Sequence, residues 1–410
     1  MPNKFYTALT ALLAGAPVAD AIQALYQTAI AENLPVAVWR LPHSDIITLC
    51  LSFSPAQHEW EPQLEHEKPG FAFCPFQESL AACNLFIPAD LVYTTAAGLV
   101  SKPNVEGINK HFLSDFLKRV EKTLGNTSSP GWHVSQQDCP QTVNQKSYTD
   151  LVEKGIEAIK AGELEKIVPS RCKKVSLPVN FNLTTLFLNL TRKYDHAFVS
   201  LVSVPQVGTW LGATPEILVT IDQNQIFKTM ALAGTQALAA APSPTQAVWR
   251  QKEIEEQALV TRYIISCFKK LRLREYEEVG PRTVVAGNLM HLRSDFKVDM
   301  AQTGFPELGT QMLQLLHPTS AVCGMPHEHA LDFLRKNEKY NRSYYSGYLG
   351  PVQINHESQI FVNLRCMQLL KTEAILYAGA GVTAESDPEK EFLETEMKMD
   401  TLLSELKVMG

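Results

Sequence analysis

The chain has no excess of positive charge. It contains 37 Lys and Arg against 43 Asp and Glu among 410 residues, which gives a formal net charge of −6. Nucleic acid would find no overall electrostatic attraction to such a chain, so we expect no nucleic-acid partner. A small anionic ligand remains compatible with this charge, but it would need a locally positive pocket or a metal ion.

Long apolar runs are also absent. No segment approaches the roughly 20 apolar residues that a transmembrane helix needs. The apolar stretch at residues 8–25 is interrupted by Pro17 and Asp20, and Lys4 stands alone where a signal peptide would carry a basic cluster. We therefore expect a soluble, cytoplasmic protein with no membrane partner.

The sequence contains no C-x-x-C pair. Its cysteines are scattered, and several lie inside apolar segments, which is typical of reduced thiols in a cytoplasmic protein. A disulfide framework and a structural zinc site are both disfavoured. The cysteines are Cys50, Cys74, Cys83, Cys139, Cys172, Cys267, Cys323 and Cys366.

The residues that are present indicate a large mixed fold. The chain is 45% hydrophobic, which is enough for a large core. Short strand-like segments such as "VAVWRLP" and "IITLCLSF" precede a polar connection at residues 125–141, and strands then mix with several long helices. This pattern predicts an α+β (mixed α/β) sandwich, with antiparallel sheets packed face to face and helices on the outside.

One predicted helix, residues 252–271, carries an apolar stripe that ends in carboxylates. Continued toward the N-terminus, the stripe reaches Glu256 and then Glu253. Acidic residues are favoured in a first helical turn by the helix dipole, so a solvated turn explains this helix alone. The apolar stripe consists of Val260, Ile264, Cys267 and Leu271.

A second predicted helix repeats the pattern. Pro388 suits its first turn, and Glu391, Glu394 and Lys398 share one face. Four carboxylates brought together would repel one another, so a divalent cation is the natural counter-charge, and hard oxygen ligands favour Mg²⁺. Two unrelated solvated acidic turns remain the alternative on spacing alone.

The segment "QIFVNLRCMQLL" predicts a buried strand that carries Arg365 on the same face as Phe361, Asn363 and Met367. An arginine in a central strand needs a partner, which is either a structural carboxylate or an anionic ligand.

Glycines and isolated polar residues add further candidates for an anion-binding or catalytic site. "YAGAGV" places two glycines at a strand end, where backbone N–H groups can approach an anion, although a plain turn explains them equally well. Four other candidates lie, in chain order, at the head of a strand, after a Thr-Pro turn, at a strand end and in a proline-flanked loop. Each of them alone is more often structural than functional. These residues are Gly379, Gly381, Lys166, Glu216, Thr235 and His317.

Together these segments resemble the chorismate-utilising enzymes, the family of anthranilate synthase component I, and most closely the isochorismate synthases. The resemblance runs from about residue 147 to the C-terminus. It rests on the ordered motifs "KIVPSR", "GATPEIL", "ALAGT", "KEIEEQALVT", "LHPTSAVCGMP", "YYSGYLG", "FVNLRC", "YAGAGV" and "DPEKEFLETEMK". The resemblance implies a single chorismate-binding domain over residues 1–410, with a variable N-terminal half (1–140) and a motif-bearing catalytic half (147–410).

The resemblance also implies the parts of a site. It makes Glu256 and Glu394 direct Mg²⁺ ligands, with Glu253 and Glu391 acting through water. The substrate chorismate would be held by the ion, by side chains that contact its two carboxylates, and by residues that line the region around its ring. These substrate-binding residues are Thr235, His317, Tyr345, Arg365, Gly379, Gly381 and Lys398.

Lys166 decides the nucleophile within the resemblance, because members that add water carry lysine there and members that use ammonia do not. Lys166 would act as the general base on water and Glu216 as the general acid on the departing C4 hydroxyl, so that the product is isochorismate. An acid in this position needs a pKa raised from about 4.3 toward neutrality, and a base of this kind needs one lowered from about 10.4.

Alternatives remain open at this point. Salicylate synthases share both catalytic residues and go on to eliminate pyruvate, whereas an ammonia-using synthase or a non-catalytic chorismate-binding protein fits the residues less well. Ser320, where proline is common, and Tyr345, where some isochorismate synthases have phenylalanine, depart from the usual pattern. We expect a monomer, and the sequence does not distinguish menaquinone, siderophore and salicylate pathways.

Overall fold

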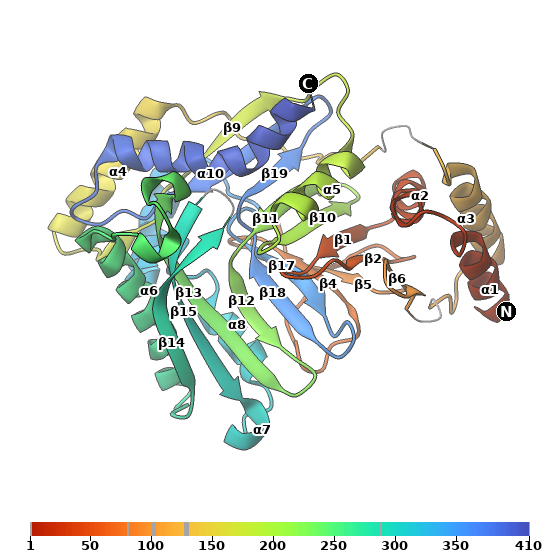
Figure 1. Ribbon diagram of the computed structural model, residues 1–410, viewed down its shortest axis with the longest axis horizontal. Helices are drawn as coiled ribbons and strands as arrows, with labels where there is room; N and C mark the ends of the chain where they lie inside the picture. The colour runs from red at the N-terminus through yellow and green to blue at the C-terminus, as the bar shows by residue number, and fades with distance from the viewer. Residues whose placement is uncertain (1, 80–81, 101–103, 127–130, 287–288, 410) are drawn as a thin grey trace.

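The computed structural model describes residues 2–79, 82–100, 104–126, 131–286 and 289–409 (Figure 1). Within these ranges the strands form two nine-stranded sheets and one two-stranded sheet, and every strand pair is antiparallel. No helix in the described part of the chain is long and apolar enough to cross a membrane.

The first sheet joins strands from both halves of the chain. Strands from residues 36–99 form one side, and strands from residues 170–379 form the other. Its order is β7 (Gly98–Leu99), β6 (Leu91–Thr94), β2 (Ile47–Leu51), β1 (Val36–Arg40), β10 (Phe198–Val204), β11 (Gly208–Thr214), β19 (Cys366–Leu369), β20 (Glu373–Gly379) and β9 (Ser170–Ser176).

The second sheet is mixed in the same way, because three strands from the N-terminal part of the chain complete its far edge. Its order is β14 (Glu277–Ala286), β15 (Leu289–Asp299), β13 (Ile226–Ala237), β12 (Ile217–Ile221), β18 (Ser358–Val362), β17 (Tyr348–Val352), β4 (Gly70–Cys74), β5 (Leu85–Pro88) and β3 (Gln57–His58). A short separate pair is formed by β8 (Lys166–Ile167) and β16 (Gly324–Met325).

Aromatic side chains fill the space between the two large sheets. Phe198 of the first sheet stacks on Phe361 of the second at 4.1 Å between ring centroids, and Trp39 packs on Phe71 at 5.2 Å. Such rings contribute a large share of the buried apolar area in a core. The predicted face-to-face sandwich of antiparallel sheets is confirmed.

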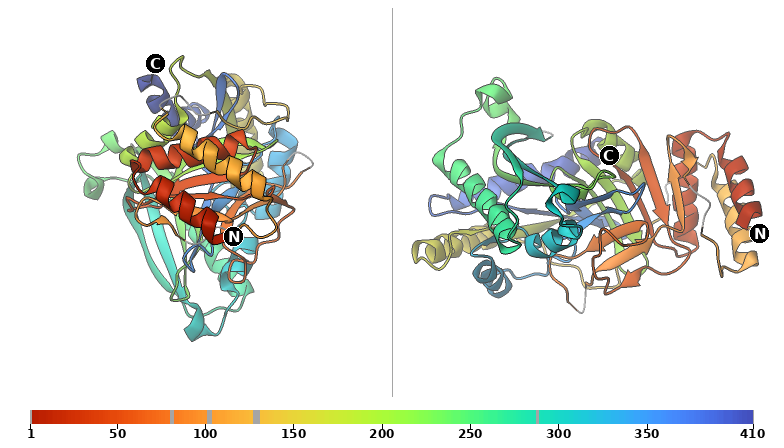
Figure 2. Two further views of the ribbon diagram at one scale, coloured as in Figure 1. Left: turned by 90° about the vertical axis from the view of Figure 1, so that its right-hand side faces the viewer. Right: turned by 90° about the horizontal axis from the view of Figure 1, so that it is seen from below.

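Helices cover the outer faces of the sandwich, as predicted (Figures 1 and 2). Over the first sheet lie α1 (Pro2–Leu13), α2 (Val18–Ala31), α3 (Lys110–Thr123), α5 (Leu183–Lys193) and α10 (Pro388–Val408), with α4 (Gln145–Lys160) against α10. Over the second sheet lie α6 (Gln251–Lys270) and α8 (Leu308–Leu316), followed in the chain by α9 (His327–Asn337); the short α7 (Met300–Thr303) follows β15.

Two crossings between the sheets position the functional region. The chain passes from β11 to β12 through Pro215 and Glu216, and from β18 to β19 through residues 363–365. The crossings are bonded to each other, because Val362 N–H donates to the Glu216 carbonyl and Ala213 N–H donates to the Arg365 carbonyl, both at 3.0 Å.

The prediction of one continuous strand through Arg365 is therefore wrong. Arg365 has a left-handed φ of +47°, which interrupts the strand where the chain changes sheet. A hydrophobic pattern cannot show this break, because both sheets bury their residues and the apolar alternation continues across it. The guanidinium lies at the junction between the two sheets and not on the face of a strand.

Candidate active site

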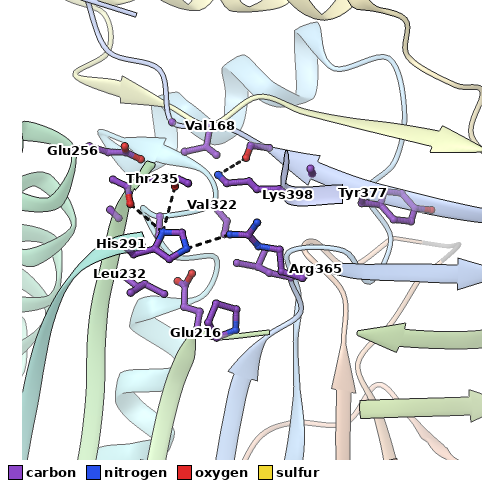
Figure 3. A pocket seen from close by; sticks show the side chains of 18 of the residues that line it. Val168, Glu216, Leu232, Thr235, Glu256, His291, Val322, Arg365, Tyr377 and Lys398 are labelled. Atoms are coloured by element: carbon purple, nitrogen blue, oxygen red, sulfur yellow. Dashed lines mark hydrogen bonds between the residues drawn. The ribbon is translucent and has the colours of Figure 1, made fainter. Parts of the chain in front are cut away.

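A cavity lies beside the two crossings, enclosed by the second sheet, α6, the end of β20 and α10 (Figure 3). Polar side chains reach it from elements that are far apart in sequence. Its lining includes eight residues that the sequence predicted for the site, namely Glu216, Thr235, Glu256, Tyr345, Arg365, Gly379, Gly381 and Lys398.

Glu216 and Arg365 come to the cavity from the neighbouring crossings. Figure 3 shows the Glu216 carboxyl and the Arg365 guanidinium on the same side of the cavity, with Glu256 on the opposite side. One guanidinium nitrogen, Nη1 of Arg365, is buried and has no hydrogen-bond partner among the described residues. A buried cationic donor without a partner is costly, so this corner of the cavity is suited to an anionic oxygen.

Glu256 lies in the second turn of α6, at the end of the apolar stripe that the sequence predicted. Val260, Ile264 and Cys267 are buried below it, and the Glu256 side chain itself is largely buried. Lys166 Nζ, fully buried at the start of β8, lies 3.1 Å from Glu256 Oε1. The second turn of α6 therefore points a carboxylate into the cavity and not into solvent.

The two cavity carboxyls have pKa values that differ in opposite directions from the ordinary value. Burial raises the pKa of Glu216 to about 7, although Lys166, Lys398 and Arg365 oppose the shift. Burial also acts to raise the pKa of Glu256, but the ammonium groups of Lys166, Lys252 and Lys398 outweigh it and lower that pKa to about 2. One site thus holds a proton-bearing carboxyl and an ionised one, which is the arrangement that acid–base chemistry needs.

Lys398 joins the strand end to the helix face. Its Nζ donates to the Gly379 carbonyl at 2.8 Å and pairs with Glu394 Oε1 at 2.7 Å. Lys398 thus occupies the Gly379 carbonyl, while the prediction that the backbone N–H groups around Gly379 and Gly381 bind an anion stays a prediction. Tyr345 stacks on Tyr377 at 5.3 Å and completes this wall.

The other acidic residues lie close to the cavity without lining it. Glu391 and Glu394 border an adjoining groove that shares Thr235 with the cavity. Glu253 points to the start of α6, where its Oε2 accepts from Arg250 N–H at 3.0 Å and its Oε1 from Arg250 Nη2 at 2.7 Å. Glu253 thus caps its helix, which is a structural role that the sequence pattern did not separate from metal binding.

Each of these four carboxylates has a cationic partner. Lys252 pairs with Glu391 and Arg250 with Glu253, while Lys166 and Lys398 serve the other two. The described residues place no three of these carboxylates within 4.8 Å of one another. The repulsion from which we argued for a cation is therefore already relieved by lysine and arginine.

The donor set nevertheless fits a hard divalent cation. Burial and, after it, the neighbouring Glu394 raise the pKa of Glu391 to about 7 against the effect of Lys252. Glu391 Oε2 is buried and has no hydrogen-bond partner in the described structure. An unpartnered carboxylate oxygen beside Glu394, with Glu256 in the adjoining cavity, is the chemistry that Mg²⁺ accepts.

A family model described as "chorismate binding enzyme" matches residues 56–407 of the chain.

This chain belongs to the chorismate-binding enzyme family.

Curated relatives agree with this assignment. The chain is 28% identical over 247 residues to the vibriobactin-specific isochorismate synthase of Vibrio cholerae serotype O1, covering 59% of this chain and 62% of that protein. It is 29% identical over 275 residues to isochorismate synthase DhbC of Bacillus subtilis (strain 168), covering 64% and 68%. The match to the Vibrio protein therefore spans less than two thirds of its length.

Solved structures share the fold. The menaquinone-specific isochorismate synthase MenF from Escherichia coli superposes with a TM-score of 0.69 at 22% identity, covering 93% of this chain and 91% of that one. Anthranilate synthase component I from Streptococcus pneumoniae gives a TM-score of 0.62 at 17% identity, covering 90% and 89%. The similarity extends over nearly the whole chain, including the N-terminal part for which the sequence offered no motif.

One predicted substrate residue of this chorismate-binding enzyme lies elsewhere. His317 does not line the cavity; its Nε2 contacts the Pro75 carbonyl at 3.0 Å and its ring packs on Tyr348. The loop after His317 instead contributes Ala321 and Val322 as an apolar wall. The histidine holds that loop against the second sheet, and the sequence could not separate this role from ligand contact.

A different histidine occupies the cavity. His291 of β15 lines it, and burial together with Arg365 and Lys398 lowers its pKa to about 3, so the ring is neutral. Its Nδ1 lies 3.0 Å from the Gly234 carbonyl, which can only accept, so Nδ1 carries the proton and Nε2 faces Arg365 Nη2 at 3.5 Å. The signal in the sequence was a lone histidine inside the apolar run "LMHL", and our sequence analysis did not select it.

Gly381 is required by the position of Glu256. A Cβ atom at Gly381 would lie 2.0 Å from Glu256 Oε1, a distance that no side chain tolerates. We expect Gly381→Ala to displace the carboxylate and to lower activity by about tenfold or more while the fold persists. Gly131→Ala is the matched control, since its Cβ would meet only Ile30 at 3.8 Å. Equal activity of both variants and the wild type, with equal melting temperatures, would contradict the assigned position of Glu256.

Proposed function

We propose that this protein is an isochorismate synthase, which converts chorismate to isochorismate with Mg²⁺ as cofactor. The observation that carries the proposal is a cavity lined by both Glu216, whose raised pKa lets it hold a proton near neutral pH, and Glu256, with the buried Lys166 behind the cavity wall 3.1 Å from Glu256. The names of the relatives support the same activity.

Both carboxylates of the substrate would find cationic partners in the cavity. The unpartnered Arg365 Nη1 would bind the enolpyruvyl carboxylate, with Tyr345 beside it. The ring carboxylate would lie near Lys398, where Glu256 and Glu394 would hold the metal and Glu391 would act through water. A bound Mg²⁺ would supply positive charge to the ring carboxylate and fix its orientation. Glu253 caps its own helix through Arg250, so it would contact the metal ion only through a water molecule.

The chemistry uses one acid and one base on opposite sides of the ring. Lys166 takes a proton from a water molecule, and the water oxygen bonds to ring carbon C2. The ring double bonds shift, the bond from C4 to its hydroxyl breaks, and Glu216 donates the proton with which that hydroxyl leaves as water. One water is consumed and one released, so no oxidant or reductant takes part.

The ion pair between Lys166 and Glu256 is part of this proposal. In the structure Glu256 neutralises the lysine at 3.1 Å. If Glu256 bound the metal ion, its carboxylate would be released from Lys166. The amine of Lys166 would then be available to a water molecule in the cavity.

The pH dependence follows from Glu216. Its carboxyl must be protonated to act as the acid, and its pKa is raised to about 7. We therefore expect kcat/KM to fall as the pH rises above about 7, since the proton is lost from the free enzyme. A flat profile between pH 6 and 9 would remove Glu216 from the acid role.

The same shift affects stability in a defined direction. The folded protein retains the Glu216 proton between the ordinary pKa of 4.5 and about 7, so it loses stability as the pH rises through this window. We expect Glu216→Gln to lack this part of the pH dependence. Thermal denaturation of both proteins at pH 5 and pH 8 measures the difference.

Removal of divalent cations is expected to abolish product formation, and excess Mg²⁺ is expected to restore it. Glu256→Gln should bind Mg²⁺ more weakly by calorimetry and lose activity, because it removes the negative charge without changing the shape of the side chain. Glu255→Gln is the matched control, since Glu255 is exposed on the same turn of α6. Equal Mg²⁺ affinity of the two variants would place the ion elsewhere.

Product analysis tests the function itself. Purified protein is incubated with chorismate and Mg²⁺, with and without ammonia, and the products are separated by chromatography. Isochorismate as the sole product, independent of ammonia, supports the proposal. Salicylate with pyruvate would make the protein a salicylate synthase, and turnover only with ammonia would overturn the role of Lys166.

A further inference from the structure

A second cluster of metal-type ligands lies on the surface, outside the cavity. His43 lies in the connection from β1 to β2, and Asp195 and His196 lie between α5 and β10. His43 Nδ1 is 3.3 Å from Asp195 Oδ2, and His43 Nε2 is 3.3 Å from His196 Nδ1. One ligand atom from each of the three lies within 4.8 Å of the other two, and no other such group occurs in the described ranges.

The buried side chain of Arg40 holds together the two connections that carry these residues. The buried guanidinium of Arg40 donates from Nη1 to the Asp195 carbonyl at 2.7 Å and to the Leu41 carbonyl at 2.9 Å, and it also contacts the Tyr194 carbonyl. His43 N–H donates to the Asp195 carbonyl at 2.8 Å. These bonds hold the two connections side by side, so the three residues are neighbours whether or not their side chains contact one another.

The spacing of the two histidine nitrogens that face each other matches a zinc site, and Asp195, whose Oδ2 lies beside the other ring nitrogen of His43, would reach the ion by a side-chain rotation. Zinc bonds to histidine nitrogen at about 2.1 Å, so two ligands on a tetrahedral ion lie about 3.4 Å apart. The two imidazole nitrogens are 3.3 Å apart. Imidazole with one carboxylate suits Zn²⁺ better than Mg²⁺, which prefers oxygen ligands alone.

We propose that His43, Asp195 and His196 bind one Zn²⁺ ion, with water as the remaining ligand. The side chains of His43 and Asp195 are 63% and 60% exposed, so the ion can enter directly from solvent. Asp195 and His196 also line a side cavity of about 210 Å³ whose lining includes Arg365. A bound ion would tie the β1–β2 and α5–β10 connections together at the outer wall of this side cavity.

The test is calorimetric titration of the full chain with Zn²⁺ in the presence of excess Mg²⁺, which keeps the carboxylate groove occupied. The variants are His196→Ala and His43→Asn, because asparagine tolerates the left-handed φ of +58° at position 43. His58→Ala is the matched control, since His58 Nδ1 lies 3.4 Å from Cys83 Sγ and offers zinc a competing pair of donors.

We expect one Zn²⁺ per wild-type chain, about tenfold or greater loss of affinity in each cluster variant, and unchanged binding in His58→Ala. Zn²⁺ should also raise the melting temperature of the wild type but not that of the double variant His43→Asn/His196→Ala. Binding that is equal in the wild type and the double variant, or lost in His58→Ala, overturns the proposal. Neither result bears on isochorismate formation, which is measured separately.

Discussion

Replacing Lys166 with methionine is expected to lower kcat by about 10²–10⁴, because we propose that this lysine takes the proton from water. The methionine keeps most of the side-chain volume in a position that is fully buried. The measurement is steady-state isochorismate formation at saturating chorismate and Mg²⁺, with melting temperatures recorded in parallel. Lys173→Met is the matched control, since Lys173 pairs with Glu396 away from the cavity.

Glu216→Gln should cause a loss of similar size, and the double variant should be little worse than either single one. The two residues act in one step, so their effects do not add. Losses that multiply in the double variant would mean that Lys166 and Glu216 serve separate functions. Retention of more than a tenth of wild-type kcat in Lys166→Met, with the fold intact, would remove lysine from the base role.

Arg365→Lys is expected to lower kcat/KM by about 10²–10³, mainly through KM, although the positive charge is kept. The guanidinium is held at a junction between sheets with one nitrogen unpartnered. A lysine ammonium cannot reproduce a two-nitrogen contact with a carboxylate. The loss corresponds to about 3–4 kcal/mol of binding free energy.

Arg293→Lys is the matched control for this change. Arg293 is a partly exposed arginine of β15 that pairs with Asp295 of the same strand. A loss confined to kcat in Arg365→Lys, with KM unchanged, would mean that Arg365 does not bind the substrate carboxylate. Calorimetric titration of the variant with isochorismate would measure the same loss of carboxylate binding without turnover.

The sequence predicted most of what depends on periodicity. The helix that carries Glu256 runs from Gln251 to Lys270. Three residues of its predicted apolar stripe, Val260, Ile264 and Cys267, are buried, whereas the fourth, Leu271, caps the helix end and is only partly buried. The last helix begins at Pro388, with the proline in its first turn. Caps, stripes and sheet alternation are local properties of the chain, so they can be read from spacing alone.

The sequence could not predict what depends on where the chain changes layer. The break at Arg365 and the neighbouring crossing at Glu216 place two side chains from different strand pairs beside one cavity. His291 and His317 are both buried histidines, and only the tertiary fold decides that the first faces the cavity and the second a loop. The cationic partner of Glu256 is likewise set by a strand some 90 residues earlier in the chain.

The central claim is that solvent water, activated opposite an acid, replaces the C4 hydroxyl of chorismate. It is tested most directly by incubating the wild-type protein with chorismate and Mg²⁺ in ¹⁸O-labelled water and weighing the product by mass spectrometry. We expect isochorismate that carries one ¹⁸O atom, bonded to C2, with no pyruvate released. Unlabelled isochorismate, or a product formed only when ammonia is present, would contradict it.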